Sequence, residues 1–510
     1  MRTPGTIWLI SISRGERLLL SCFLAVLAGA VLAFGGAEPA SGFAAESMLF
    51  SLAACSFWLV SLKMPRAPWL SIILLSSYLA VNWFVTRPAP YPATRELMLV
   101  GAAVCSFCLA ARFAIVPAMC RLLCGSLLIL VLLEALYGLV QYLTGWQQIA
   151  TFKKVQYTMM ATGTYINPNH FAGLLEMALP LTFAWALWQF ERLAASKSSG
   201  RRTATHQSLL ASALSGEIAP VCAFFLFATL ILAAAILFSR SRMGIFSAFI
   251  GVSAVAGFWL AGRRKVQVAV GRHSAVVLLL LMLACVLAAG VWIGMDPVLA
   301  RFREAGSDFP SRTATWKATI ELIREHPLWG SGPGSFEDSF TLVQQKYLTS
   351  RFDHAHNDYL ELAEEWGLPG AILLFLPAVL IMVRSASAIR RAGLSEEPML
   401  LAGCFGGSLA MLVHSVADFN LHIPANAFLF ATLLGLAWAL SERLSSREGA
   451  QLNLPRERAS PSQPTPCRSS CRRNCDSRAA QFARLKCGSP GQSGSALELV
   501  STPLFPARRR

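Results

Sequence analysis

The chain has 510 residues, of which 55% are hydrophobic and only 14% are charged, and its formal net charge at pH 7 is +16. A soluble protein of this size is rarely so apolar, and many stretches of about twenty residues carry few charges, enough to cross a bilayer as helices. The excess positive charge sits in short loops and in the C-terminal tail, which is typical of segments beside a membrane rather than of a nucleic-acid-binding protein.

Hydropathy predicts about twelve membrane helices, because backbone groups inside lipid must be hydrogen-bonded within the segment. They are expected at residues 18–36, 43–62, 69–86, 96–111, 122–144, 170–190, 219–238, 243–262, 275–295, 366–383, 400–417 and 424–441. Starting with the N-terminus inside, the alternation of helices puts the Lys- and Arg-rich loops on the cytoplasmic side. The predicted fold class is therefore an all-α polytopic membrane protein with a long external loop.

Five parts follow from this reading. They are a cytoplasmic N-terminus (1–17), nine membrane helices (18–295), an external, periplasmic catalytic loop (296–365), three more membrane helices (366–441) and a basic, disordered cytoplasmic tail (442–510). The first helix is expected to be retained rather than cleaved as a signal peptide. The cysteines of the tail do not have a standard zinc spacing.

The loop 296–365 is far longer than an ordinary connection, so it is expected to be functional. Its stretch 309–330 predicts an amphipathic helix, and 357–367 predicts a short helix that ends at Gly367. Between them "GSGPGS" (330–335) is expected to be a flexible turn-rich segment. It lacks the Lys and Ser/Thr of a phosphate-binding P-loop, so no nucleotide site is predicted there.

Three arginines stand on the external side. Arg240 and Arg242 belong to the tight turn "SRSR", where the charge rule disfavours arginine. A guanidinium suits phosphate recognition, although both side chains could equally be interface anchors. Arg312, at the start of the expected loop helix, is a second phosphate-binding candidate or a solvated charge.

The stretch "HAHNDYLELAEEWGLPG" (354–370) brings histidines and acids to the edge of the bilayer. His356 is a candidate general base, because a neutral imidazole accepts a proton near neutral pH. The alternatives are a polar residue flanking a helix, and a metal site with Asp353, His354 and Asp358. That metal set is short and lacks a distant second ligand pair.

Two further segments place polar residues at external helix ends. Asn167, Asn169 and His170 suit sugar hydroxyls, although Asn-Pro-Asn also turns the chain and caps a helix. Asp418 is a functional candidate because acids are costly near lipid, while a helix-packing hydrogen bond explains it equally well.

These segments, in this order, resemble the O-antigen ligase and polymerase superfamily. The likeness rests on His356-Asn357 followed after nine residues by Gly367-Leu-Pro-Gly370, and on four other segments: "GTYINPNHFAG", "SRSR", "SRTATW" and "PLWGSGPGSF". It is strong over residues 160–425 and leaves the tail outside.

The resemblance implies an inverting glycosyltransferase, of O-antigen ligase type, in the bacterial inner membrane with its active site facing the periplasm. The donor would be an undecaprenyl-diphosphate-linked glycan, and the acceptor a hydroxyl of lipid A-core or of another glycan, at a membrane-lipid surface without nucleic acid. No cofactor and no metal ion are implied. His356 would be the base and Arg240, Arg242 and Arg312 would hold the diphosphate. Polar residues near them are expected to bind substrate: Asn167, Asn169, His170, Asn357, Asp358 and Asp418.

Alternatives remain open within and outside this family. A polymerase for O-antigen or exopolysaccharide, or a protein O-glycosyltransferase, would carry the same motifs. A secondary transporter or flippase would also have about twelve helices, although the two halves of the chain show no obvious symmetry.

Overall fold

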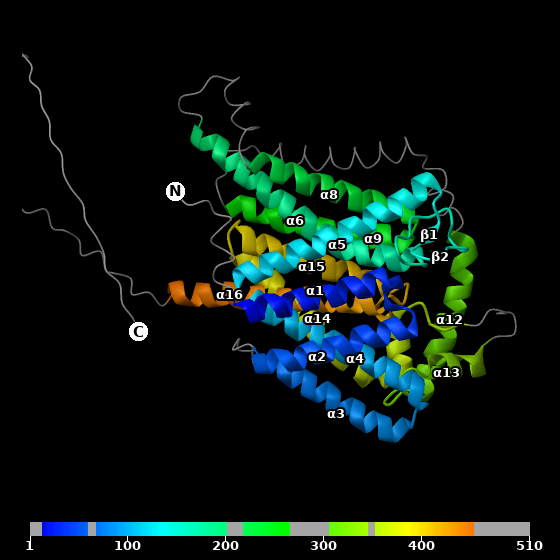
Figure 1. Ribbon diagram of the computed structural model, residues 1–510. Coiled ribbons are helices and arrows are strands. Elements are labelled where there is room, and N and C mark those ends of the chain that lie inside the picture. The colour runs from blue at the N-terminus through cyan, green and yellow to red at the C-terminus, as the bar shows by residue number, and fades with distance from the viewer. Residues whose placement is uncertain (1–12, 60–67, 201–217, 266–304, 345–351, 453–510) are drawn as a thin grey trace, which may run out of the picture. The chain divides into compact units, whose positions relative to one another are not determined.

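The computed structural model describes residues 13–59, 68–200, 218–265, 305–344 and 352–452 (Figure 1). Its elements are, in chain order, α1 (Arg14–Leu32), η1 (Phe34–Gly36), α2 (Pro39–Leu59), α3 (Pro68–Thr86), α4 (Pro90–Ala114), α5 (Pro117–Thr144), β1 (Gln148–Ile149), β2 (Phe152–Lys153), α6 (Pro168–Gly200), α8 (Ile218–Ser239), α9 (Arg242–Lys265), α12 (Ala305–Glu325), α13 (Phe336–Val343), α14 (Asp358–Arg391), α15 (Glu396–His414), η2 (Asn420–His422) and α16 (Pro424–Leu452).

Ten helices in this part of the chain are long and apolar enough to cross a membrane. The predicted all-α, multi-pass class is confirmed. Every predicted helix has a counterpart except 275–295, which lies outside the described residues. The segment expected at 43–62 forms α2, which is helical but is not one of the ten.

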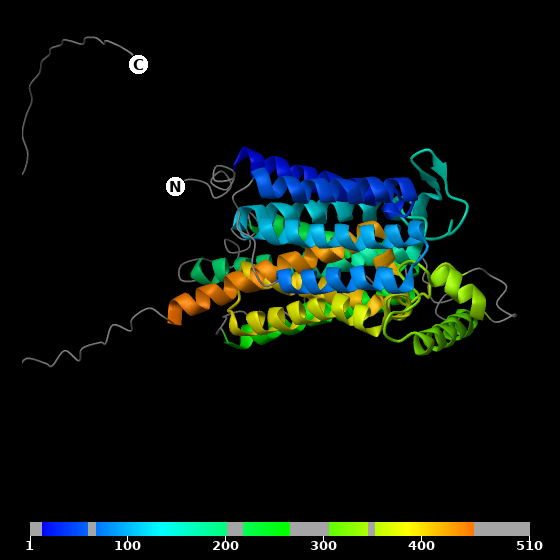
Figure 2. The same ribbon diagram turned by 90° about the horizontal axis from the view of Figure 1, so that it is seen from below.

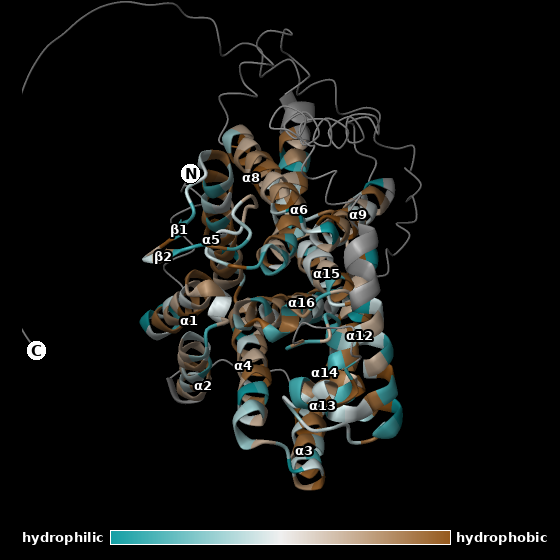
Figure 3. Ribbon diagram, turned by 90° about the vertical axis from the view of Figure 1, so that its right-hand side faces the viewer, coloured by the Kyte–Doolittle hydropathy of each residue, from teal (hydrophilic) through white to brown (hydrophobic). Residues whose placement is uncertain are grey.

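The core forms where apolar helices pack on one another. The helix α16 lies against α4, and α6 lies against α8, α9 and α15. Their contacting faces are mostly Leu, Ala and Phe, and the spans of α6 and α16 are almost entirely buried. Figure 3 shows these helices largely in the hydrophobic colour, whereas α12 carries hydrophilic patches.

At one end of the bundle the helices are tied by ion pairs. Arg391 lies 2.9 Å from Glu448, Arg384 lies 2.6 Å from Glu442, and Arg447 of α16 lies 2.7 Å from an oxygen of Glu397. The helix α16 continues through Leu452, past its expected end at 441, because these pairs hold its last turns. The first residues of the expected disordered tail are therefore helical, and 453–510 lie outside the described residues.

The opposite end carries the connections that build the site (Figures 1 and 2). Between α5 and α6 the strands β1 and β2 pair antiparallel, with Gln148 opposite Lys153. The helices α12 and α13 lie at this same end. The helix α12 begins at Ala305, before the expected start, and α13 falls on residues that the hydropathy pattern does not assign to a helix.

A kink at Gly367 joins the expected short helix 357–367 and the expected membrane helix 366–383 into one element, α14. Gly367 has φ 69° and ψ 168°, a backbone region that only glycine enters cheaply. Any Cβ there would overlap the carbonyl of Leu328. Glycine is therefore required both by the backbone conformation and by the close approach of the segment that joins α12 to α13.

The connector from α12 to α13 is held at this kink by backbone hydrogen bonds. Leu368 N donates to Pro327 O at 2.9 Å, and Ser331 N donates to Glu364 O at 2.9 Å. These bonds tie the start of "GSGPGS", which was expected to be a flexible segment, to α14.

Candidate active site

His356 pairs with Asp418 across the connection between α15 and α16. Its Nδ1 lies 3.2 Å from Asp418 Oδ1; the side chain of Asp418 is 1% exposed and that of His356 is 29% exposed. A carboxylate at this distance accepts a hydrogen bond from Nδ1–H. It thereby favours the tautomer of the neutral ring that has its lone pair on Nε2. Nε2 is therefore the atom that can take a proton from a substrate hydroxyl.

Both carboxylate oxygens of Asp418 accept hydrogen bonds. Phe419 N donates to Oδ1 at 3.0 Å, and Asn169 Nδ2, from the first turn of α6, donates to Oδ2 at 2.6 Å. Asn169 is itself oriented because its backbone N donates to Asn167 Oδ1 at 2.9 Å. The structure thus brings the Asn-Pro-Asn segment and Asp418, far apart in sequence, into one hydrogen-bonded set.

Hydrogen bonds and a nearby guanidinium stabilise the ionised form of Asp418. Burial on its own would raise the pKa of Asp418, but the hydrogen bond from His356 and the charge of Arg312 hold that pKa well below its usual range. Arg312 of α12 also donates to the carbonyl of Ala417. Asp418 is therefore a permanent negative charge behind His356, and Arg312 stands beside the pair.

The backbone at His356 is strained. Its φ is 51°, in the left-handed region that non-glycine residues seldom adopt and that costs on the order of 1–3 kcal/mol. The next residue, Asn357, caps α14, since its Oδ1 accepts from Tyr359 N and Leu360 N, both at 3.0 Å. The cap and the left-handed turn together aim the His356 ring at Asp418.

One aromatic ring, that of Phe419, packs against three histidines. His354 stacks on it with ring centroids 4.1 Å apart, while His356 and His170 meet it edge-on at 5.0 and 4.7 Å. His170 is buried and is fixed by this ring, with its Nε2 3.5 Å from Asn167 Nδ2. Phe419 gave no signal in the sequence beyond its place next to Asp418.

A second set of charged groups includes His354, which stacks on Phe419. His354 Nδ1 is 2.6 Å from Glu361 Oε1, and His422 Nδ1 is 2.8 Å from Asp358 Oδ1. Asp358 is fully buried, and its other oxygen accepts from Leu421 N at 3.2 Å. Asp358, expected to bind substrate, is thus occupied in holding the 420–422 turn against α14.

His422 is charged by its neighbours. Burial on its own lowers the pKa of His422, but the carboxylates of Glu361, Glu96 and Asp358 raise it well above its usual value. The positive charge of the His422 ring thereby offsets part of the negative charge that these carboxylates carry.

Two groups of residues have the donor atoms of a metal site. His354, Glu361 and His422 bring one ligand atom each to within 4.8 Å of one another, as do Glu96, Glu365 and His422. The set considered from sequence does not converge, because His354 faces Glu361 while His356 faces Asp418. Ion pairs within the cluster account for the short distances at both Nδ1 atoms.

The "SRSR" turn joins α8 to α9. Arg240 has φ 57°, and its guanidinium lies 5.8 Å from the centre of the Tyr142 ring, a cation–π contact with α5. Ser241 Oγ accepts from Gly244 N at 3.2 Å and caps α9, whose first residue is Arg242. The contacts recorded for Arg240 face α5 and do not link it to His356.

The comparisons with known proteins cover part of this site. Residues 227–375 match the family model described as O-Antigen ligase. The "Exopolysaccharide production protein ExoQ" of Rhizobium meliloti (strain 1021) is 28% identical over 137 residues, which is 26% of this chain and 31% of ExoQ. The chain therefore spans about a third of the length of the curated relative it matches. Arg240, Arg242, Arg312 and His356 lie inside the family match, and Asp418 lies outside it.

Proposed function

We propose, on the premise that the chain belongs to the O-antigen ligase and polymerase superfamily, that it is a membrane glycosyltransferase. It moves a glycan from undecaprenyl diphosphate to an acceptor hydroxyl on the periplasmic face of the bacterial inner membrane. The observation that carries the proposal is the pair of His356 and Asp418 with Arg312 beside it, at the end of the bundle that bears α12 and α13.

In the proposed reaction His356 Nε2 accepts the proton of the acceptor hydroxyl. The acceptor oxygen attacks the anomeric carbon of the donor, the carbon–oxygen bond to the diphosphate breaks, and the electron pair leaves on the diphosphate. Because the acceptor oxygen attacks directly, from the face opposite the leaving diphosphate, the configuration at the anomeric carbon inverts. The proton on His356 is stabilised by the buried charge of Asp418 and is later lost to solvent or to the leaving group.

Negative charge grows on the diphosphate as the sugar leaves, so guanidinium groups placed in advance lower the barrier. Arg312 is beside the His356–Asp418 pair and is the first candidate for this role. Arg240 and Arg242 lie at the adjacent end of α8 and α9, where a lipid-linked diphosphate would reach them from the bilayer. The energy comes from the activated donor, so no nucleotide is needed; the proposal gives the arginines the role that a metal ion could play on the diphosphate.

The acceptor of the proposed enzyme is a sugar hydroxyl of lipid A-core, as in an O-antigen ligase. A second candidate is a growing polysaccharide chain, which is favoured by the name of the relative, an exopolysaccharide production protein. A transporter or flippase is the alternative of another class, and it predicts that His356 is dispensable for transfer.

The test is glycan transfer by the purified chain in nanodiscs, with a polyprenyl-diphosphate oligosaccharide as donor and EDTA present. Three reactions contain donor alone, donor with lipid A-core, and donor with a Ser-rich peptide. A single shift of lipid A-core supports the ligase, a ladder with donor alone supports the polymerase, and a modified peptide supports a protein glycosyltransferase. Absence of transfer in all three, also after metal is restored, would overturn the proposal.

A further inference from the structure

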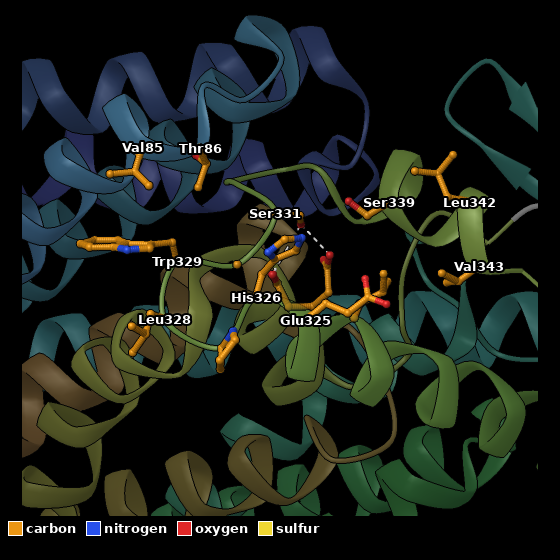
Figure 4. Close-up of a pocket in the computed structure, with 14 residues that line it drawn as sticks. Val85, Thr86, Glu325, His326, Leu328, Trp329, Ser331, Ser339, Leu342 and Val343 are labelled. Atoms are coloured by element: carbon orange, nitrogen blue, oxygen red, sulfur yellow. Dashed lines mark hydrogen bonds between the residues drawn. The ribbon is translucent and has the colours of Figure 1, made fainter.

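A cavity of about 640 Å³ lies apart from the His356–Asp418 pair, between the end of α3, the connector after α12, and α13 (Figure 4). Val85 and Thr86 form its α3 side, and Ser339 of α13 lies across from them. Glu364 of α14 is also part of its wall. Its volume falls within the usual range for small-molecule sites.

The wall combines apolar side chains, such as Leu322, Leu342 and Val343, with several polar groups and one aromatic residue in a fixed position. Ser331 Oγ donates to the buried Glu364 Oε1 at 2.5 Å, and Glu325 and His326 add exposed polar groups. Trp329 stacks on Tyr78 with ring centroids 5.5 Å apart and an interplanar angle of 12°. A pocket of hydroxyl, carboxylate and indole groups suits a sugar ring, which offers hydroxyls on its edge and C–H bonds on its faces.

The arrangement of Trp329 is set before any ligand binds. Asn82 Nδ2 donates to Trp329 O at 2.6 Å, and Tyr78 OH donates to Leu328 O at 2.7 Å. Two side chains of α3 thus hold the connector residues that line the cavity. A preorganised wall loses less entropy when a flexible glycan binds.

The helix α14 links the cavity to the proposed base. Asp358 begins this helix two residues after His356, and Glu364 follows six residues later, about 9 Å along the axis at 1.5 Å per residue. A rise of this size along α14 is comparable to a short stretch of oligosaccharide, so the cavity suits a sugar further along the same chain as the reacting one.

We propose that this cavity is a carbohydrate subsite for a sugar residue remote from the reacting bond, and that it selects neutral or amino sugars over acidic ones. This rests on the proposed transferase function for its biological meaning, but binding at the cavity is measurable without transfer. Among the fourteen residues that line it, all within the described part of the chain, Glu325 is the exposed carboxylate, His326 is the basic side chain, and there is neither Lys nor Arg. An acidic sugar would bring a like charge against Glu325.

Binding is tested first, with the purified full chain in nanodiscs and three tetrasaccharides: of glucose, of glucosamine and of galacturonate. We expect glucosamine and glucose to bind at least about tenfold more tightly than galacturonate. Glu325→Gln should reduce the preference for glucosamine, whereas Glu321→Gln, an exposed acid one turn earlier in α12 and outside the cavity, should not. Equal binding of galacturonate, or no binding of any tetrasaccharide at millimolar concentration, overturns the proposal.

Kinetics then show which substrate enters the cavity. Ser339→Trp fills it, and Asp338→Trp is the matched control on the exposed side of α13. We expect Ser339→Trp to raise KM for one glycan substrate at least about tenfold with kcat preserved. A higher KM for the donor assigns the subsite to the donor glycan, and a higher KM for the acceptor assigns it to the acceptor.

An unchanged KM for both substrates in Ser339→Trp refutes the subsite while transfer persists. Absence of transfer by the wild-type chain refutes the proposed function instead. The tetrasaccharide binding result is independent of that outcome. Thermal melting of both Trp variants shows whether each is folded.

Discussion

Replacing Asp418 by Asn removes one charge from the proposed active site and keeps the shape of the side chain. The amide introduced by Asp418→Asn would still accept a hydrogen bond, but it would no longer oppose the positive charge that forms on His356 when the acceptor proton is taken. We expect kcat for transfer to fall while the protein remains folded. The amide oxygen can still accept from Phe419 N, whereas the hydrogen bond from Asn169 Nδ2 to the second carboxylate oxygen is lost, so folding is checked directly.

The structure gives the magnitude. At an effective dielectric constant of about 20, a full negative charge interacts with a full positive charge 3.2 Å away by about 5 kcal/mol, and this is the distance between Asp418 Oδ1 and His356 Nδ1. The side chain of His356 is 29% exposed, so solvent screens part of this energy. If about half remains, the loss is roughly 2.7 kcal/mol, or about 100-fold in kcat.

The assay is the initial rate of transfer at saturating donor and acceptor, with expression and thermal melting measured on the same preparation. Asp338→Asn makes the same chemical change at an exposed site of α13 and should retain the wild-type rate. A rate within about threefold of wild type for Asp418→Asn, in folded protein, would refute the reasoning, since the buried charge would then have no part in proton transfer.

Three further predictions concern the base, the kink and a charged turn. His356→Ala and Arg242→Ala should each abolish transfer with normal membrane expression, and full activity in both variants would contradict the site assignment. Gly367→Ala should lower the free energy of unfolding by at least about 2 kcal/mol, because a Cβ overlaps Leu328 O and the backbone is left-handed; an unchanged melting temperature would argue against it. The pKa of His422 is raised in the folded state, so its stabilisation is present below about pH 6.5 and is lost as the pH rises through the folded value. Melting temperatures should therefore decline across that interval, and less so in His422→Gln; equal slopes would show that another group titrates.

The helical framework was predictable because it depends on composition. A bilayer leaves apolar stretches of this length few alternatives to helix, and the positions of α4, α5 and α8 follow within a few residues. Hydropathy did not indicate the helix α13, which lies at the same end of the bundle as the site. The helix α13 is eight residues long and packs two phenylalanines against each other, so it carries no membrane-length signal.

Single residues of the site were predictable by chemical type, and their partners were not. His356 and Asp418 each stood out as polar residues at helix ends, but 62 positions separate them, and only the turn after α15 brings them to 3.2 Å. The role of Glu361 was missed because an acid in the first turn of a helix is expected for the helix dipole alone. Its contact with His354 depends on the left-handed turn at His356, which no local pattern indicates.

The kink at Gly367 has a consequence for the lipid environment. Residues 358–366 form about 14 Å of helix between the base and the point where α14 turns into its long apolar segment. The proposed donor is anchored by its polyprenyl tail, so the height of its diphosphate follows the bilayer surface, while the height of His356 follows the protein. A bilayer that is thinner or thicker than the hydrophobic length of α14 shifts the donor diphosphate relative to His356. Transfer should then depend on the acyl-chain length of the lipid, because the helix 358–366 fixes the distance between His356 and the apolar segment of α14.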